Sequence, residues 1–470
     1  MTIVASTLAA AILAATPPAE LATLTIPDGA SGDEAGRSVS ASGDRVLVGV
    51  PLSNAGGPSN RGAAWIFRRT ATGAWMPEAE LLAPDGAADD EFGLSVSLDG
   101  DVAIVGALND DVAGKVDAGS ASIFRRGPRG WTFEATIVAG DGQPNDEFGR
   151  SVAIRGDVAI VGAWTSGLFD QGAAYVFRRQ PNGTWLQTQK LTPPGSASGD
   201  QFGTALAFDG TRAIVGAWGD EDGPATNTGS ASVFRSENGG PFQFEAKLIG
   251  ADVVSGDELG RGVAIDDTLA VVGCWPFFGN GIGKAYVFRR AGTAWTQEAK
   301  LTAPDGASDD YFGFSVSCTR SGGAERIACG AWADDVAGTT NQGSVWIFES
   351  GGGGWAPTEQ LIATDGAPSD YFGFSLAFAC ESLVVGVRLD DVETATNRGS
   401  ARVWWIADDD ADGVDDRCGA AEDLDGSGAV DAADLALLLG AWGQPGASDL
   451  DGNGTTDAAD LAALLGAWTG

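Results

Sequence analysis

The residues best suited to chemistry lie in two acidic segments near the C-terminus. DLDGSGAVDAADLALLLGAWG begins at Asp423, and a close copy, DLDGNGTTDAADLAALLGAWT, begins at Asp449. Each segment places oxygen-bearing side chains at positions 1, 3, 5, 9 and 12 of a twelve-residue loop, with glycine at position 6, as calcium-binding loops do. Because neither loop contains a sulfur or imidazole ligand, the pattern favours calcium over a transition metal.

The loops predict two sets of Ca²⁺ ligands, in which the residue at position 7 contributes its backbone carbonyl oxygen. The first set is Asp423, Asp425, Ser427, Ala429, Asp431 and Asp434. The second set is Asp449, Asp451, Asn453, Thr455, Asp457 and Asp460. A short helix is expected after each loop, over residues 432–439 and 458–465. Because the carboxylates repel one another without metal, we expect this module to fold on binding calcium.

A third acidic segment precedes these loops and contains Asp408, Asp410, Asp412 and Asp415. The composition changes abruptly after Ala407, which predicts a domain boundary there. Two interpretations of residues 408–421 stay open, namely a further calcium site and a solvated acidic linker. Residues 422–470 then form the C-terminal module.

The composition of the chain excludes several classes of chemistry. The 470 residues include 28 Lys and Arg and 64 Asp and Glu, which gives a net charge of −36. A chain this acidic is expected to repel nucleic acid and anionic membranes. There is no histidine, so Ser-His-Asp and Cys-His catalysis and imidazole-ligated zinc or haem are excluded. Carboxylate chemistry and calcium binding remain.

The N-terminal segment resembles a secretory signal. The apolar run over residues 3–15 is too short to span a bilayer and is followed by Thr16-Pro17-Pro18, which predicts a signal peptide over residues 1–19. No later run approaches the roughly 18 apolar residues of a transmembrane helix, so we expect an exported protein without such an anchor. The cysteines allow at most two disulfides; they are Cys274, Cys318, Cys329, Cys380 and Cys418.

One sequence unit is repeated seven times and is marked by two glycines. The spacing from the first glycine to the second is constant, as from Gly36 to Gly49, except in the sixth copy, where it is longer. A turn such as Asp99-Gly100 at the midpoint predicts two strands joined by a hairpin. Two further β-rich segments complete each copy. The first glycines are Gly36, Gly93, Gly149, Gly203, Gly260, Gly313 and Gly373, and the second are Gly49, Gly106, Gly162, Gly216, Gly273, Gly330 and Gly386.

Four antiparallel strands repeated seven times predict a seven-bladed β-propeller over residues 20–407. The last copy ends at Trp404-Trp405 without a fourth strand, whereas residues 20–26 match a fourth strand. We therefore expect the N-terminal strand to complete the last blade and to close the ring. The predicted fold class is mainly β, with a small α-helical C-terminal domain.

The recurring FG, VGA and GSAxVF segments over residues 20–407 resemble the FG-GAP repeat family, which includes the propeller of integrin α chains and many secreted bacterial proteins. The resemblance implies a β-propeller, a secreted or cell-surface protein of bacterial origin, and a role in binding or adhesion. Integrin propellers also carry calcium in D-x-D-x-D-G loops of the blades. No copy contains that full loop, so the resemblance does not imply calcium in the blades.

Residues 422–470 resemble the type I dockerin family, because a duplicated calcium loop is followed in each copy by one helix. The loops are EF-hand-like, although Asp replaces the usual Glu at position 12. The resemblance implies Ca²⁺ as cofactor and a cohesin-like or other extracellular scaffold protein as partner. The loop positions that help dockerins contact cohesin are occupied by Ala432, Ala433, Ala458 and Ala459. The segment around Asp408–Asp415 is similar to a thrombospondin type 3 calcium repeat.

The two faces of the predicted propeller differ in charge. The loops before strand one and after strand two share a face and are rich in Asp and Glu, whereas the turns between strands three and four carry arginine pairs such as Arg68-Arg69. The acidic face also carries Trp164, Trp218, Trp275 and Trp332. These indoles could stack on sugar rings or pack between blades. The acidic loops could likewise bind a ligand or be ordinary turns.

These patterns predict a secreted, non-enzymatic binding or adhesion propeller that is tethered by a calcium-dependent, dockerin-like module. The alternative is a carbohydrate-binding or glycoside-hydrolysing component of an extracellular polysaccharide-degrading (cohesin–dockerin) assembly, since paired carboxylates can serve a glycosidase. Repetition of the acids in nearly every blade argues against catalysis, because an active site is usually asymmetric.

Overall fold

The computed structural model describes residues 18–70, 72–167, 169–221, 225–276, 281–320, 325–379, 382–406, 432–440, 442–443, 456, 458, 461 and 464–465. Its secondary structure is almost entirely β within residues 18–406. Among the C-terminal residues that the structure describes, helix α1 (Ala432–Gly440) agrees with the helix expected after the first loop.

Each of the first four blades is a sheet of four antiparallel strands in sequence order. The strands of blades 1 and 2 are β2 (Val39–Ser42), β3 (Arg45–Val50), β4 (Ala63–Arg69), β5 (Trp75–Leu81), β6 (Ser95–Asp99), β7 (Val102–Ala107), β8 (Ser120–Gly127) and β9 (Gly130–Ile137). Those of blades 3 and 4 are β10 (Phe148–Arg155), β11 (Val158–Ala163), β12 (Ala173–Arg179), β13 (Trp185–Leu191), β14 (Phe202–Phe208), β15 (Arg212–Ala217), β16 (Ser230–Ser236) and β17 (Phe242–Leu248).

Blades 5 and 6 follow the same order, and blade 7 combines the two ends of the propeller. The strands of blades 5 and 6 are β18 (Leu259–Asp266), β19 (Leu269–Cys274), β20 (Lys284–Ala291), β21 (Ala294–Leu301), β22 (Ser315–Thr319), β23 (Arg326–Ala331), β24 (Ser344–Gly351) and β25 (Gly354–Leu361). Those of blade 7 are β26 (Phe372–Ala379), β27 (Ser382–Val387), β28 (Ser400–Trp405) and β1 (Ala19–Leu24).

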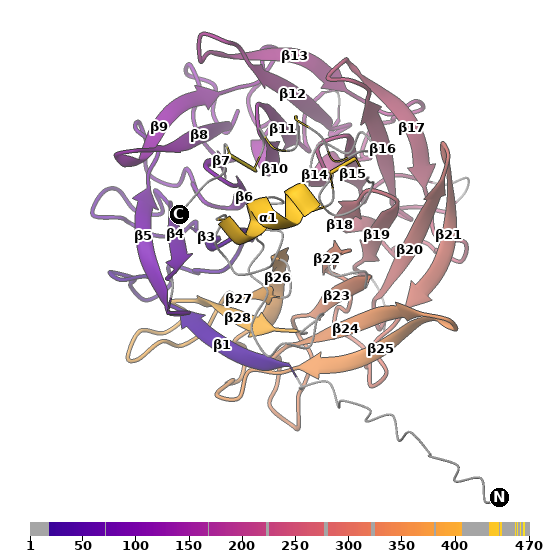
Figure 1. Cartoon of the computed structure of the whole chain (residues 1–470). Coiled ribbons are helices and arrows are strands. Elements are labelled where there is room, and N and C mark those ends of the chain that lie inside the picture. Colours follow the sequence, from indigo (N-terminus) through magenta and orange to yellow (C-terminus); the bar gives the residue numbers. More distant parts are fainter. Residues whose placement is uncertain are drawn as a thin grey trace, which may run out of the picture.

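The N-terminal strand closes the ring, as the sequence predicts. Strand β1 pairs antiparallel with β28, with Glu20 opposite Trp404 and Leu24 opposite Ala401, so that it is the outer strand of blade 7 (Figure 1). Leu24 and Ile26 are buried in the core beside it. Because this pairing joins residues far apart in the chain, it links the first and last blades without a covalent bond.

The two motif glycines hold neighbouring blades together. In all seven blades, a Cβ added to the second glycine would clash with the carbonyl oxygen of the first glycine of the next blade, so these backbones approach as only glycine allows. The contact of Gly386 with Gly36 completes the circle. In five blades a serine hydroxyl also donates to that carbonyl oxygen, at 2.7 Å for Ser95 on Gly149 and 2.8 Å for Ser375 on Gly36.

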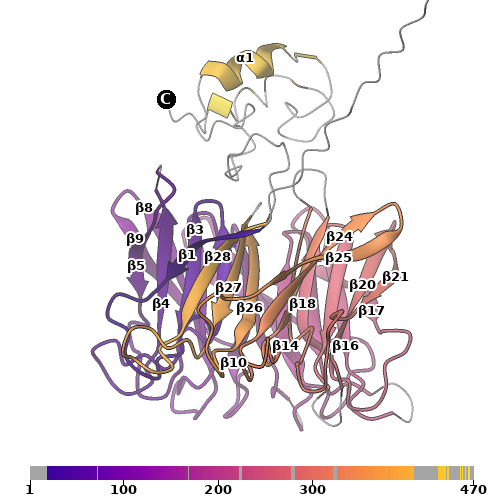
Figure 2. The same ribbon diagram turned by 90° about the horizontal axis from the view of Figure 1, so that it is seen from below.

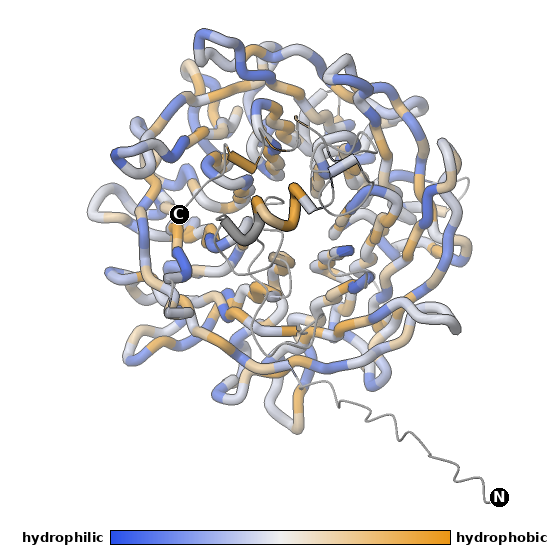
Figure 3. Tube along the Cα trace, in the orientation of Figure 1, coloured by the Kyte–Doolittle hydropathy of each residue, from blue (hydrophilic) through white to orange (hydrophobic). Residues whose placement is uncertain are grey.

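The phenylalanine of each FG pair fills the space between two blades. Phe92, for example, is fully buried, packs edge-to-face on Phe124 of its own blade at 6.2 Å, and forms a parallel β-bridge with Gly62 of the preceding blade. Leu259 and Ala35, which replace this phenylalanine in two copies, are equally buried. The apolar core therefore lies between adjacent sheets, and Figure 3 shows hydrophilic stretches in the loops and along the outer strands.

We call the face formed by the loops before the first strand and after the second strand of each blade the entry face. We call the opposite face the hairpin face, since it carries the turns that join strands one and two and strands three and four. Figure 2 shows the hairpin face above, with the turn between β24 and β25 at its edge, and the entry-face loops below.

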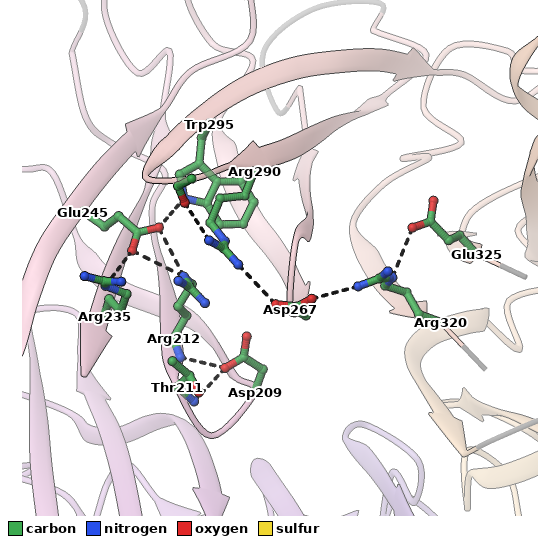
Figure 4. A network of polar contacts seen from close by, with 11 residues as sticks. Asp209, Thr211, Arg212, Arg235, Glu245, Asp267, Arg290, Trp295, Arg320 and Glu325 are labelled. Carbon is green, nitrogen blue, oxygen red and sulfur yellow. Dashed lines mark hydrogen bonds and ion pairs between the residues drawn. The ribbon is translucent and has the colours of Figure 1, made fainter. Parts of the chain in front are cut away.

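On the hairpin face, many arginines form contacts between blades. The carboxylate of Glu245 on β17 accepts from Arg212 (3.2 Å) and from the indole of Trp295 in the next blade (2.8 Å) (Figure 4). Glu78, Glu134 and Glu298 occupy the same position on other outer strands and make the same kind of contact. Their partners include Arg126 and Trp131 for Glu78, Arg179 for Glu134 and Trp355 for Glu298.

Figure 4 also shows how this network extends around the ring. Asp267 accepts from Arg290 of its own blade at 3.2 Å and from Arg320 of the next blade at 2.9 Å. Arg320 in turn contacts Glu325 at 3.1 Å. The arginine-bearing face predicted from the sequence is therefore present, and many of its charges are neutralised within the protein.

Removal of β1 is expected to open the ring at blade 7. We expect a chain that begins at Thr25 to unfold at a lower temperature than a chain that begins at Pro18, because β28 loses its hydrogen-bonded neighbour and Leu24 leaves the core. Amide hydrogen exchange in β28 should accelerate at least about tenfold, while exchange in β15 of the opposite blade should change less. Equal protection of β28 in both chains would show that the ring does not depend on β1.

Candidate functional site

The acidic loops of the entry face contain one aspartate per blade whose role is structural. In each blade, one carboxylate oxygen of this buried residue accepts a hydrogen bond from the backbone N–H three residues earlier, as in Ala307 N–H to Asp310 (2.5 Å) and Ala367 N–H to Asp370 (2.5 Å). The seven residues are Asp33, Asp90, Asp146, Asp200, Asp257, Asp310 and Asp370. They stabilise the turn that leads into the first strand.

The aspartates after the second strand also have partners within the chain. Ser344 donates its hydroxyl to Asp334, and Ser400 donates to Asp390, both at 2.5 Å, which fixes the start of the third strand. The neighbouring Asp335 accepts the backbone N–H of Asn341 at 2.8 Å. These contacts support the interpretation of the acidic loops as ordinary turns.

Basic side chains from the chain itself neutralise acidic residues of these loops in several blades. Lys247 contacts Asp220 at 2.5 Å in blade 4, and Lys284 contacts Asp257 at 2.6 Å in blade 5. Lys190 contacts Asp141 in blade 3, and Arg402 contacts Asp390 at 3.0 Å in blade 7. Within the residues that the structure describes, no group of three or more acidic or cysteine side chains has an arrangement suited to a metal ion.

The four tryptophans predicted as a ligand face lie at the same position of blades 3 to 6, and all are half-buried. Trp218 and Trp275 both contact the Arg261 guanidinium, whose central carbon lies 3.8 and 4.8 Å from their ring centroids. Trp332 stacks on Tyr311 at 4.9 Å, and Trp164 donates its indole N–H to Glu147 at 2.5 Å. Each indole thus contacts side chains of the entry face, in part across blade boundaries.

These tryptophans belong to a larger ring of side chains that the sequence analysis did not identify. The residues immediately before the FG phenylalanine and after the FG glycine in each blade stand at the start of the innermost strand, around the propeller axis (Figure 1). We call this ring, together with the four tryptophans and Arg388, the axial mouth. It contains Glu34, Arg37, Glu91, Leu94, Glu147, Arg150, Gln201, Thr204, Glu258, Arg261, Tyr311, Phe314, Tyr371 and Phe374.

The axial mouth has an aromatic side and a charged side. In blades 6 and 7, Trp332 contacts Tyr371 at 4.7 Å, and Phe314 contacts Phe374 at 5.0 Å between centroids. In blades 1, 3 and 5, arginine follows the FG glycine instead. The sequence contains a signal for this ring, because its members stand directly before and directly after the FG pair in each copy.

A cavity of about 230 Å³ lies further along the axis and is lined by the seven innermost strands. Its lining includes Ser40, Ser97 and Ser317, whose hydroxyls accept backbone N–H groups of the next blades at 3.0 to 3.1 Å. Cys318 also lines it, and burial raises the pKa of its thiol. The four tryptophans do not line this cavity.

Among the C-terminal residues, α1 includes the backbone of Ala432, Ala433 and Asp434, and Ala458 is exposed. The remaining predicted calcium ligands, the acidic residues of 408–415 and Ala459 lie outside the described residues, as do Cys380 and Cys418. Cys274, Cys318 and Cys329 are free thiols. No helix among the described residues is long and apolar enough to cross a membrane.

The turn aspartates predict a pH dependence of stability. Burial raises the pKa of Asp310 and of Asp370 to about 6, with nearby carboxylates adding to the effect. Because the folded pKa lies above the unfolded value near 3.9, each group stabilises the fold at low pH and this contribution is lost as pH rises through about 6. Glu78 and Glu134 have lowered pKa values, so their contribution is lost as pH falls below about 4.5.

We therefore expect the free energy of unfolding to be larger at pH 5 than at pH 7. Asp310→Asn keeps an acceptor for the Ala307 N–H but removes the charge, so it should raise stability at pH 7 by on the order of 1 kcal/mol and change it less at pH 5. The exposed neighbour Asp309 provides the control, since Asp309→Asn should leave the pH dependence unchanged. Urea unfolding at both pH values measures this, and an unaltered pH dependence in Asp310→Asn would contradict it.

The family model for the FG-GAP repeat matches the chain seven times, over residues 19–67, 75–124, 131–177, 185–234, 242–288, 295–348 and 355–404. Each match starts at or near the outer strand of one blade and ends within the third strand of the next, so the repeat spans a blade boundary. No curated protein matches the chain significantly. Seven matches in succession cover most of the chain, which therefore belongs to the FG-GAP repeat family.

Proposed function

We propose that this protein is a secreted, non-enzymatic binding or adhesion protein whose propeller presents the axial mouth to a ligand. Membership of the FG-GAP family supports a binding role, and such repeats are typical of extracellular proteins. The C-terminal module would tether the propeller to a cohesin-like or other extracellular scaffold in a calcium-dependent way.

The observation that carries the proposal is the backbone conformation of seven residues of the axial mouth. The residue before the FG phenylalanine has a positive φ in every blade, between 50° and 61°, although none is glycine. These residues are Glu34, Glu91, Glu147, Gln201, Glu258, Tyr311 and Tyr371. Several positive-φ positions in the outer loops use Asn or Asp, such as Asn60, Asp117 and Asn227, which tolerate this conformation.

Glutamate, glutamine and tyrosine have no such advantage, so these residues occupy the mouth at a backbone cost. Residues of this kind cluster at ligand-binding sites. The seven side chains are of three types, so the mouth is not seven-fold symmetric. Both features favour a specific ligand at the axis over a purely structural ring.

The partners of the carboxylates support a non-enzymatic role. Seven aspartates hold turns, and Glu78, Glu134, Glu245 and Glu298 hold neighbouring blades together. A glycosidase needs one pair of carboxylates free to act on substrate. Hydrolysis of a polysaccharide that is abolished by one Asp or Glu substitution in one blade would overturn this part of the proposal.

The packing of the C-terminal residues supports a duplicated module. Leu438 and Leu464 are fully buried against each other, with Leu435 and Leu461 beside them. Both pairs have the same sequence separation as Asp423 and Asp449, the starts of the two predicted loops, so equivalent positions of the two copies contact each other. This internal symmetry is the arrangement expected of a tandem calcium-binding module.

A second candidate is carbohydrate binding at the mouth. Among the described residues, the buried indole N–H groups of Trp218 and Trp332 have no acceptor, and sugar hydroxyl groups could provide one. Glycan binding by the full chain that is lost in the double variant Trp218→Ala and Trp332→Ala would favour this candidate. Retention of binding in that variant would exclude these two indoles.

Calcium titration tests the tether. We expect the chain over residues 20–470 to bind about two or three Ca²⁺ ions in a calorimetric titration. We expect a chain that ends at Ile406 to bind none, because the predicted loops follow that residue. Calcium binding by both chains would assign metal to the propeller, and binding by neither would overturn the calcium-dependent tether.

A further inference from the structure

The axial mouth contains four arginines, and three of them have carboxylate partners within the chain. Arg37 contacts Glu34 at 3.5 Å, and Arg261 contacts Glu258 at 2.7 Å, each pair being three residues apart. Arg388, which follows the second strand of blade 7, contacts the two carboxylate oxygens of Glu34 at 2.7 and 3.0 Å. Pairing of arginine with a neighbouring glutamate is thus the rule at this site.

Arg150 of blade 3 departs from that rule. Glu147, three residues earlier, corresponds to Glu34 and Glu258 but accepts the indole N–H of Trp164 at 2.5 Å instead. The Arg150 guanidinium lies over the Trp164 ring at 5.1 Å, and its buried Nε has no acceptor among the described residues. Arg150 as a whole is half-buried, but a buried N–H group without an acceptor is costly, which makes this a place where an external anion would be stabilising.

The surroundings of Arg150 include charges of both signs. Burial is the main cause that lowers its pKa, to about 10, and Arg37 and Arg261 from blades 1 and 5 act in the same direction. Glu147 and Glu91 act in the opposite direction, and neither is hydrogen-bonded to Arg150. Arg150 therefore stays charged at neutral pH.

We propose that Arg150 binds the carboxylate of a ligand. This carboxylate pairs with Arg150 as Glu34 and Glu258 pair with the arginines of blades 1 and 5. The inference rests on the proposed function, in which the axial mouth is the binding surface. A ligand with a single carboxylate is favoured, because the net charge of −36 and the acidic entry face repel polyanions. Trp164, which lies against Arg150, favours an apolar or aromatic group beside that carboxylate.

The first test compares phenylacetate with phenylacetamide, which has the same shape without the charge. Tryptophan fluorescence of the full chain is measured during titration with each compound. We expect phenylacetate to bind at least about tenfold more tightly, because an amide cannot form the charge-assisted pair. This comparison needs no variant, so it stands even if a substitution at Arg150 disturbs folding.

The second test uses a matched pair of variants on strand β10. Arg150→Gln should abolish the preference for the acid, and Arg150→Lys should restore part of it. Arg155 lies at the other end of β10 and pairs with Asp99 at 3.1 Å, so Arg155→Gln should keep the preference. Thermal unfolding of each variant checks that the fold is intact.

Equal binding of acid and amide to the mouth would overturn the carboxylate inference while leaving the mouth as a binding surface. Absence of binding by phenylacetate, or an unchanged preference in Arg150→Gln, would also overturn it.

The source of the carboxylate is identified by adding Ac-Phe-Asp-NH₂ and its Asn counterpart. Tighter binding of the Asp peptide than of phenylacetate would support an acidic side chain of a protein partner, and the reverse order would support a free carboxylic acid.

Discussion

The contact between two glycines of neighbouring blades is the constraint on which the rest of this structure depends. The second motif glycine of each blade packs on the carbonyl oxygen of the first motif glycine of the next, and Gly386 on Gly36 makes the series circular. In blades 1, 2 and 6 the two glycines are also hydrogen-bonded within the blade, as in Gly93 N–H donating to the Gly106 carbonyl oxygen at 3.0 Å. One residue type therefore sets both the fold of each blade and the distance between blades.

This close approach explains how the axial mouth arises. The innermost strands begin within three residues of the first motif glycine, so the side chains on either side of the FG pair converge on the axis. Charges of nonadjacent blades then influence one another, since Arg37 of blade 1 and Arg261 of blade 5 both lower the pKa of Arg150 in blade 3. The repeat keeps the backbone of these positions the same and leaves their side chains free to differ, which gives a symmetric framework an asymmetric centre: arginine in three blades, aromatic residues in two.

The sequence was sufficient to predict the seven blades, the four strands in each and the closure by β1, because glycine spacing and hairpin turns depend on local chemistry. The position of α1 was also predicted correctly. The sequence left open whether the acidic loops bind a ligand, and the structure shows aspartates such as Asp310 bonded to their own turns. The role of Arg150 could not be predicted, because it depends on whether Glu147 pairs with that arginine or with Trp164. The partner of Glu147 depends on the positions of side chains across the mouth, and the spacing of residues in the sequence does not give those positions.

The most direct measurement of the central contact is the stability of two glycine variants of blade 2. Gly106 lies at a blade boundary, whereas Gly127 at the end of β8 has open space where a Cβ would stand, and neither has a positive φ. We expect Gly106→Ala to lower the free energy of urea unfolding by about 2–3 kcal/mol or more, because the methyl group separates the two blades. We expect Gly127→Ala to change it by less than about 1 kcal/mol. Equal effects of the two substitutions would contradict the account.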